Sequence, residues 1–131
     1  MKRQLIISNT AELIRLHAED IVSIEADGNY STLYIVGEEK RVVLFQLGQL
    51  ERMMAEQLAE EAEAFVRIGR SLIINRKYIY YINLNRQQLM LRDTIGHQHE
   101  TLKVSRESLK KLKELIENDD LIKEDNGQGT L

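Results

Sequence analysis

Short apolar runs separated by turn signals dominate this sequence and restrict its fold more than any other feature. The run Tyr30 to Val36, for example, contains β-branched and aromatic residues, which favour strands. Turns with glycine beside Asn, Asp or charged residues separate such runs, as in Asp27-Gly28-Asn29, and turns this short join antiparallel strands. We therefore predict about nine or ten short strands, at residues 5–7, 13–16, 21–26, 30–36, 41–45, 65–68, 72–75, 79–83, 88–92 and 102–104.

Helical spacing occurs in two segments. Leu47, Leu50, Met54 and Leu58 lie three or four residues apart with glutamates between them, which predicts an amphipathic helix of about four turns. Leu109, Leu112 and Ile116 repeat this spacing, and Ser105 before them is a favoured N-cap residue. We therefore predict a second helix of about three turns over 105–116. Strands therefore outnumber helices. The predicted fold class is mainly β, with antiparallel sheets rather than strands alternating with helices.

The length of 131 residues fits a single domain, which we place at residues 1–118. Residues 119–131 are polar and acidic and are expected to form a flexible tail. The absence of cysteine excludes disulfides, thiolate catalysis and cysteine-based zinc sites. No apolar run approaches the roughly 18 residues of a membrane span, and the first residues are apolar over too short a stretch for a signal peptide. We therefore expect a cytoplasmic protein with no membrane partner.

The formal net charge of -3 disfavours nucleic acid at first sight, but the charge is unevenly distributed. Acidic residues concentrate in the first predicted helix, over 51–63, and in the last fifteen residues. The stretch 64–92, in contrast, carries six basic residues and no acidic residue. Four of the six cations lie at predicted strand ends or in turns, where side chains can be presented to a phosphate backbone. A one-sided solubility pattern is the alternative explanation.

Two predicted turns of this basic stretch carry polar and basic side chains. Arg70 and Ser71 stand at one turn, and Asn75 to Lys77 stand at the next. The strand between them spans about 17 Å, so the two turns are expected at opposite ends of that strand and cannot contact the same base step.

At this point the sequence resembles the LytTR-type DNA-binding domain. The resemblance is carried by Ile24-Glu25-Ala26-Asp27-Gly28-Asn29-Tyr30, by the segment FVRIGRSLIINRKYI over 65–79, and by Val104-Ser105-Arg106. It extends from about Leu5 to Ile116, in the same order and spacing. It implies an elongated set of small antiparallel sheets with a short helix between them and a C-terminal helix. It also implies a bacterial transcription regulator that reads successive major grooves of double-stranded DNA with loop residues.

The resemblance implies three base-contacting residues, Ser31, Arg70 and Arg106, and Arg is the commonest specific reader of guanine. A larger group is predicted to contact the DNA backbone or support these residues: Asn29, Tyr30, Arg67, Ser71, Asn75, Arg76, Lys77, Lys103 and Ser105. Alternatives remain for some of them. Tyr30 could be ordinary strand packing, and Asn75 could cap a turn through its own side chain. Arg106 could simply open the last helix, although a cation is poorly placed against the helix dipole there.

Two departures from the family pattern affect these expectations. The family usually has histidine before the Arg-Ser pair, where this sequence has Gly69. The resemblance therefore does not say which base this turn prefers. Members also usually carry an N-terminal receiver domain. A chain of 131 residues leaves no room for one, so we expect a stand-alone domain whose regulatory partner and input signal are unknown.

No catalytic constellation stands out, so an enzyme is not expected, and no cofactor is predicted. His97 and His99 could face the same side of a strand as metal ligands, but a third ligand is not evident and a metal site is disfavoured. The predicted partner is double-stranded DNA, with repeated half-sites and a possible homodimer on the DNA. The alternative function is a β-rich protein-interaction module that recruits an acidic partner.

Overall fold

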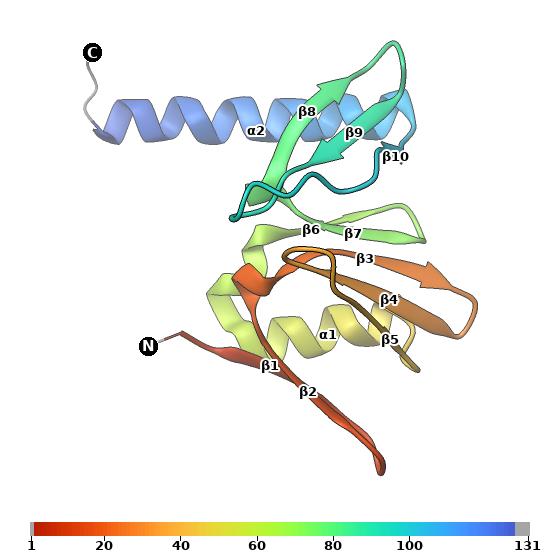
Figure 1. Ribbon diagram of the computed structural model, residues 1–131. Coiled ribbons are helices and arrows are strands. Elements are labelled where there is room, and N and C mark those ends of the chain that lie inside the picture. Colours follow the sequence, from red (N-terminus) through yellow and green to blue (C-terminus); the bar gives the residue numbers. More distant parts are fainter. Residues whose placement is uncertain (1, 128–131) are drawn as a thin grey trace. The chain divides into compact units, whose positions relative to one another are not determined.

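The fold is mainly β, with small antiparallel sheets and fewer helices, as the sequence predicts (Figure 1). A computed structural model describes residues 2–127, and these contain ten strands in three sheets, together with two α-helices. The strands are β1 (Gln4–Ser8), β2 (Leu13–His17), β3 (Ile21–Asp27), β4 (Tyr30–Ile35), β5 (Lys40–Val43), β6 (Phe65–Ile68), β7 (Leu72–Asn75), β8 (Ile79–Asn83), β9 (Gln88–Leu91) and β10 (Leu102–Lys103). The helices are α1 (Leu47–Leu58) and α2 (Arg106–Gly127), with short 3-10 turns η1 (Ala18–Asp20), η2 (Ala59–Ala64) and η3 (Arg76–Tyr78).

The chain divides into two compact units. Unit 1 consists of Met1–Tyr78 and Arg92–His97, and unit 2 consists of Ile79–Leu91 and Gln98–Leu131. Unit 1 holds the five-stranded sheet, in the order β5-β4-β3-β7-β6, and the separate β1-β2 hairpin. Unit 2 holds the three-stranded sheet, in the order β10-β9-β8, and helix α2.

Helix α1 packs against the five-stranded sheet and the β1-β2 hairpin and completes the core of unit 1 (Figure 1). Its buried residues are the four that the periodicity predicts, Leu47, Leu50, Met54 and Leu58. At the start of the helix, the backbone N–H of Gln46 donates to Oε1 of Gln49 at 2.8 Å, as in a capping box. The helix is 12 residues long and ends before Ala59, which has a φ of 53°.

The register of the five-stranded sheet places two turns at the same end. Asp27 pairs with Tyr30 across the β3-β4 hairpin, and Ile68 pairs with Leu72 across the β6-β7 hairpin. Because β3 pairs antiparallel with β7, the two turns are neighbours, and the N–H of Ala26 donates to the carbonyl of Ser71 at 2.8 Å. We call this edge, formed by residues 27–30 and 69–71, the turn end of the sheet. The β4-β5 turn and the end of β7 lie at the opposite end.

The segment Arg92–His97 is joined to the rest of unit 1 by a buried carboxylate. Asp93 is buried and accepts hydrogen bonds from the backbone N–H groups of Gly37 (2.8 Å), Ile95 (3.1 Å) and His97 (3.0 Å). Three N–H donors satisfy a charge that would be costly to bury alone.

Unit 2 is built around β8 and α2. Strand β8 pairs with β9, and α2 contacts β8 through a face on which Leu109 and Leu112 are buried. The helix continues to Gly127 and so includes residues 119–127, and no proline or glycine interrupts the sequence before Gly127. The domain boundary at residue 118 and the flexibility of the tail stay predictions. The rest of the expected tail, 128–131, lies outside the described residues. No helix among the described residues is long and apolar enough to cross a membrane.

Candidate nucleic-acid interface

The β3-β4 turn presents polar side chains at the turn end of the sheet. Gly28 has a φ of 63° and is the first of the two loop residues, the arrangement of a type II′ hairpin turn. Asn29 is exposed, and Tyr30 is 51% exposed. Half of the surface of Tyr30 faces solvent, so its contact with DNA stays a prediction beside the packing alternative.

The β6-β7 turn lies beside it and carries Arg70 and Ser71. Both side chains are exposed. Gly69, which precedes them, has a φ of 60°, a conformation that favours glycine. The structure therefore brings together four of the predicted residues, two from each turn: Asn29, Tyr30, Arg70 and Ser71.

Ser31 does not share this exposure. It has no exposed surface, and its Oγ donates a hydrogen bond to the carbonyl of Phe45 at 2.7 Å. The cause is the alternation of β4, since Ser31 faces the same side of the strand as the buried residues Leu33 and Ile35. In this conformation the hydroxyl is not available to a base. The predicted base contact of Ser31 is therefore not supported by its position. Ser31 instead fixes the segment after β5 against the start of β4.

Arg67 is directed toward the β6-β7 turn rather than into solvent. Its side chain is 30% exposed and forms an ion pair with Glu51 of α1, at 2.8 Å between Nη1 and Oε1. The sequence suggested a phosphate contact or a supporting role, and the geometry favours the supporting role. Nothing in the sequence indicates the pair with Glu51, because the two residues belong to different elements, 16 positions apart.

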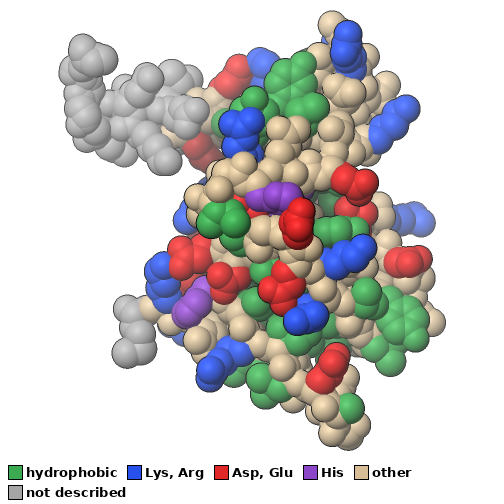
Figure 2. Space-filling model, in the orientation of Figure 1, with side chains coloured by type: hydrophobic (Ala, Val, Ile, Leu, Met, Phe, Trp, Pro, Cys, Tyr) green, Lys and Arg blue, Asp and Glu red, His purple; other side chains and the backbone are tan. Residues whose placement is uncertain are grey.

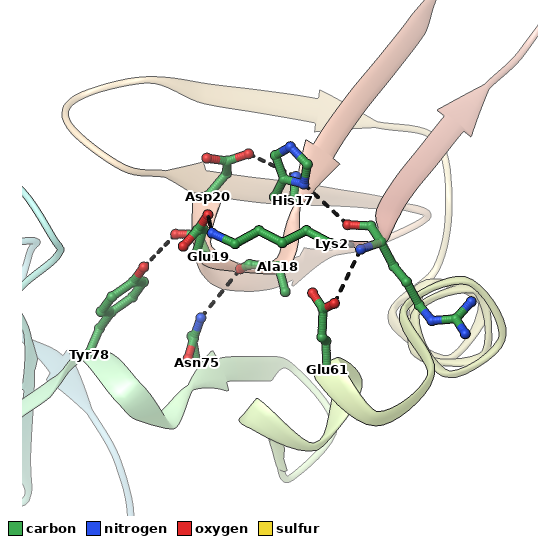
Figure 3. Close-up of polar contacts among 9 residues, drawn as sticks. Lys2, His17, Ala18, Glu19, Asp20, Glu61, Asn75 and Tyr78 are labelled. Atoms are coloured by element: carbon green, nitrogen blue, oxygen red, sulfur yellow. Dashed lines mark hydrogen bonds and ion pairs between the residues drawn. The ribbon is translucent and has the colours of Figure 1, made fainter.

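Asn75 begins a group of predicted residues at the opposite end of the sheet, as the strand length predicts (Figure 3). It is 1% exposed, and its Nδ2 donates to the carbonyl of Ile21 at 3.0 Å and to that of Ala18 at 3.4 Å. Its Oδ1 accepts from the N–H of Lys77 at 3.1 Å. The structure shows the turn-capping alternative, and of the two predicted roles for Asn75, a backbone contact or a supporting contact, the buried amide fits the supporting one. Arg76 and Lys77 lie in the same turn, away from Arg70.

Charged side chains at this opposite end have partners within the protein (Figure 3). Lys2 forms a hydrogen-bonded ion pair with Glu19, which raises the pKa of Lys2 and lowers that of Glu19. Glu61 accepts a hydrogen bond from the N–H of Arg3 at 3.2 Å. A cavity of about 240 Å³ lies here, lined by these groups and by His17 and Asn75 among others. Its lining contains both signs of charge, including the predicted backbone contact Lys77, and the amide of Asn75 is satisfied within the protein.

In unit 2, Ser105 and Arg106 stand at the start of α2. The Oγ of Ser105 accepts a hydrogen bond from the N–H of Ser108 at 3.2 Å, which confirms the predicted N-cap. Arg106 is the first residue of the helix and is exposed, as is Lys103 on β10.

The cations of the basic stretch do not converge on one surface of unit 1. Arg70 lies at the turn end, Arg67 is paired with Glu51, and Arg76 and Lys77 lie at the opposite end. Successive antiparallel turns alternate between the two ends of a sheet, so a continuous basic sequence does not make a continuous basic surface. On the face of unit 1 that Figure 2 shows, basic and acidic side chains are interspersed.

Comparison with known proteins bears on what this arrangement does. Residues 11–117, most of the chain, match the family model of the LytTr DNA-binding domain. The chain belongs to the LytTR family. A similar solved structure is the LytTr DNA-binding domain of a Bacillus cereus protein described as a putative methyl-accepting/DNA response regulator, with a TM-score of 0.59 and 19% sequence identity. The match covers 88% of this chain and 98% of that chain, and at this identity it concerns the fold. None of the curated proteins matches the sequence significantly.

Membership of the LytTR family confirms the resemblance and the fold class predicted from the sequence. LytTR domains are DNA-binding domains of transcription regulators, and the family is not an enzyme family. No group of three or more His, Cys, Asp or Glu that could hold a metal ion occurs among the described residues.

Proposed function

We propose that this LytTR domain binds double-stranded DNA sequence-specifically, as part of a bacterial transcription regulator that acts in the cytoplasm. The observation that supports the proposal is the adjacency of the β3-β4 and β6-β7 turns at one sheet end, where Arg70 is exposed. Side chains on neighbouring tight turns can enter a major groove together, and a guanidinium fork matches the O6 and N7 of guanine. Arg70 is the proposed base reader of unit 1. Asn29, Tyr30 and Ser71 are the proposed backbone contacts around it.

Arg106 is the proposed base reader of unit 2. It is exposed on the first turn of α2, where a cation gains nothing from the helix dipole. Lys103 and Ser105 precede it and are proposed as backbone contacts, with the Ser105 hydroxyl also capping the helix. Ser31 and Asn75 are proposed as supporting residues only, because both are buried.

Selection of bound sequences from a random duplex pool tests the proposal. The parent protein is expected to enrich one sequence, and binding to it is expected to weaken as salt increases. Arg70→Ala and Arg106→Ala should each cost about 1–3 kcal/mol and relax preference at one position. Arg15→Ala is the matched control, because it removes an exposed arginine from the β1-β2 hairpin. If both test variants bind the enriched duplex as well as the parent does, the assignment of the two readers is wrong.

Repeated half-sites are proposed as the target, with two copies of the chain bound to them. A single small domain makes few base contacts, and two linked binding events increase both affinity and specificity. Sedimentation of the protein with duplexes that carry one or two copies of the enriched sequence measures the stoichiometry. Binding of one copy to a two-site duplex at saturation would contradict this part of the proposal.

A protein-interaction module that recruits an acidic partner is the second candidate, and one observation favours a docking role. Strand β5 is an edge strand, and the apolar side chains of Val42 and Leu44 are 57% and 61% exposed at this edge. Exposed edges and apolar patches are typical of interaction sites. Failure to enrich any sequence after several rounds of selection would favour this candidate over DNA binding.

A further inference from the structure

The Arg67 side chain forms three hydrogen bonds around the β6-β7 turn. Its Nε donates to the carbonyl of Gly69 at 3.0 Å, and its Nη2 donates to the carbonyl of Arg70 at 3.4 Å. Its Nη1 donates to Oε1 of Glu51 at 2.8 Å. One guanidinium therefore connects helix α1 to the backbone on both sides of the Arg70 Cα.

We propose that Arg67, oriented by Glu51, is a positioning residue that sets the direction of the Arg70 side chain for reading a base. This inference rests on the proposed function of Arg70. It assigns to Arg67 a role other than the phosphate contact that its charge suggests.

The β6-β7 turn begins with a residue that has wide backbone freedom. Gly69 has no side chain, and a Cβ built on it would meet nothing within 4 Å. Glycine is also the residue with the most backbone freedom, so an unsupported Gly69 would let the next peptide rotate. The planar fork of Arg67 donates to the carbonyls of both Gly69 and Arg70, which fixes the peptide groups on either side of Arg70. The backbone then sets the direction in which the Cα–Cβ bond of Arg70 leaves the turn.

The ion pair with Glu51 offers a way to distinguish a positioning role of Arg67 from a phosphate contact. Charge-assisted hydrogen bonds to a carboxylate are stronger than those to neutral carbonyls, so Glu51 is the partner that fixes the guanidinium plane. The same carboxylate neutralises Arg67 and reduces its attraction for phosphate. Removing the negative charge of Glu51 should therefore change DNA binding in opposite directions under the two hypotheses. A phosphate-binding Arg67 would be freed and bind DNA more tightly, whereas a positioning Arg67 would lose its anchor.

Glu51→Gln, Arg67→Lys and the control Glu56→Gln test the proposal. Glu56 is an exposed acid of the same helix, so its replacement changes the net charge equally. The measurement is the dissociation constant for the duplex that the parent enriches and for an unrelated duplex, at one salt concentration. The preference for the enriched duplex, taken from these two constants, is expected to fall roughly tenfold in Glu51→Gln, the scale of one charge-assisted hydrogen bond. Arg67→Lys should lower the preference similarly, because a lysine keeps the charge but lacks the fork. Glu56→Gln should leave it unchanged.

Tighter binding of Glu51→Gln than of Glu56→Gln, or full retention of the preference by Arg67→Lys, would show that Arg67 acts as a charge and overturn the proposal. To distinguish positioning from a general structural role of Glu51 and Arg67, the preference is measured again for Glu51→Gln in the Arg70→Ala background. A positioning effect disappears there, since the side chain that it directs is gone, whereas a loss of equal size in both backgrounds would contradict the proposal. The parent and Arg70→Ala also test the proposed function separately, because a parent that enriches no duplex refutes DNA reading itself.

Discussion

Gly69 has a backbone conformation that limits which residues the β6-β7 turn tolerates. Its φ of 60° lies in the left-handed region, where side chains with a Cβ are strained. The family usually has histidine at this position, and histidine is among the residues that enter this region more often than most. In this chain, glycine avoids the strain and carries no ring, and Arg67 donates hydrogen bonds to the carbonyls of Gly69 and Arg70 in this turn.

Gly69→Ala is expected to lower the free energy of unfolding by about 1–2 kcal/mol, because alanine must adopt the left-handed conformation. No clash adds to this cost, since the space around the new Cβ is open. Gly48→Ala is the control, and its effect on the free energy of unfolding is expected to have the opposite sign. Gly48 lies in α1 with an ordinary φ, so alanine there should raise the free energy of unfolding by up to about 1 kcal/mol. Urea denaturation of both variants measures the difference. Equal effects of the two substitutions would show that φ at Gly69 is not the cause.

Tyr78 links η3 to η1 through a hydrogen bond that its hydroxyl donates to the carbonyl of Glu19. Burial of the ring raises the pKa of Tyr78 above its ordinary value of 10.0. The neutral hydroxyl is therefore favoured in the folded chain. Its stabilising effect is complete below the pKa of the unfolded chain and is lost as pH rises through the higher pKa of the folded chain.

Tyr78→Phe measures this effect. At neutral pH the parent is expected to be more stable than the variant by about 1 kcal/mol, the net value of a typical hydrogen bond. The difference should shrink above pH 10.0, the ordinary pKa of a tyrosine, because the hydroxyl of the unfolded chain ionises first. Denaturant unfolding of both proteins across this pH range gives the difference directly. A difference that grows with pH would have the wrong sign for a raised pKa.

Among the elements, helix α1 shows how much of the fold local sequence contains. The apolar residues at helical spacing predicted its buried face, because period and burial are both local properties. Its end at Ala59 was not predictable in the same way. A positive φ at alanine is unusual and requires tertiary support.

The candidate site was predictable in its parts but not in its assembly. Both turns follow from glycine signals, whereas their adjacency depends on the pairing of β3 with β7, strands separated by most of unit 1 in sequence. The burial of Ser31 and Asn75 and the pair of Arg67 with Glu51 also depend on contacts between distant elements. Residue type indicates which side chains can contact DNA, and only the register decides which are exposed.

Leu50→Ala tests the contribution of α1 to the core of unit 1. Leu50 has no exposed surface, so the substitution leaves a cavity and should cost about 2–5 kcal/mol. The neighbouring half-buried Met53 is the control, and Met53→Ala should cost less because part of that side chain already faces solvent. Thermal and urea unfolding compare the two. Similar losses in both variants would show that α1 does not pack on the sheet by the predicted face.

At the scale of the whole molecule, charge is spread rather than collected. The formal net charge is -3. In unit 1, Arg70 lies at one end of the sheet, Arg76 and Lys77 lie at the other, and Arg67 is paired with Glu51. A protein of this kind attracts phosphate weakly at long range. In the proposed function, specific binding then depends on a few placed arginines, and both proposed readers, Arg70 and Arg106, are exposed.

The salt dependence of binding measures this balance. Each neutralised phosphate contributes about 0.9 to the slope of log K against log salt, so a domain with few phosphate contacts is expected to show a slope smaller than about 5 in magnitude. Lys103→Ala should reduce the slope by about 1 while leaving the enriched sequence unchanged. Arg70→Ala should change the sequence preference more than the slope, because a base contact carries specificity and releases few counterions. A steeper slope, together with equal affinity for the enriched duplex and for unrelated duplexes, would mean that non-specific electrostatic attraction rather than placed arginines drives binding.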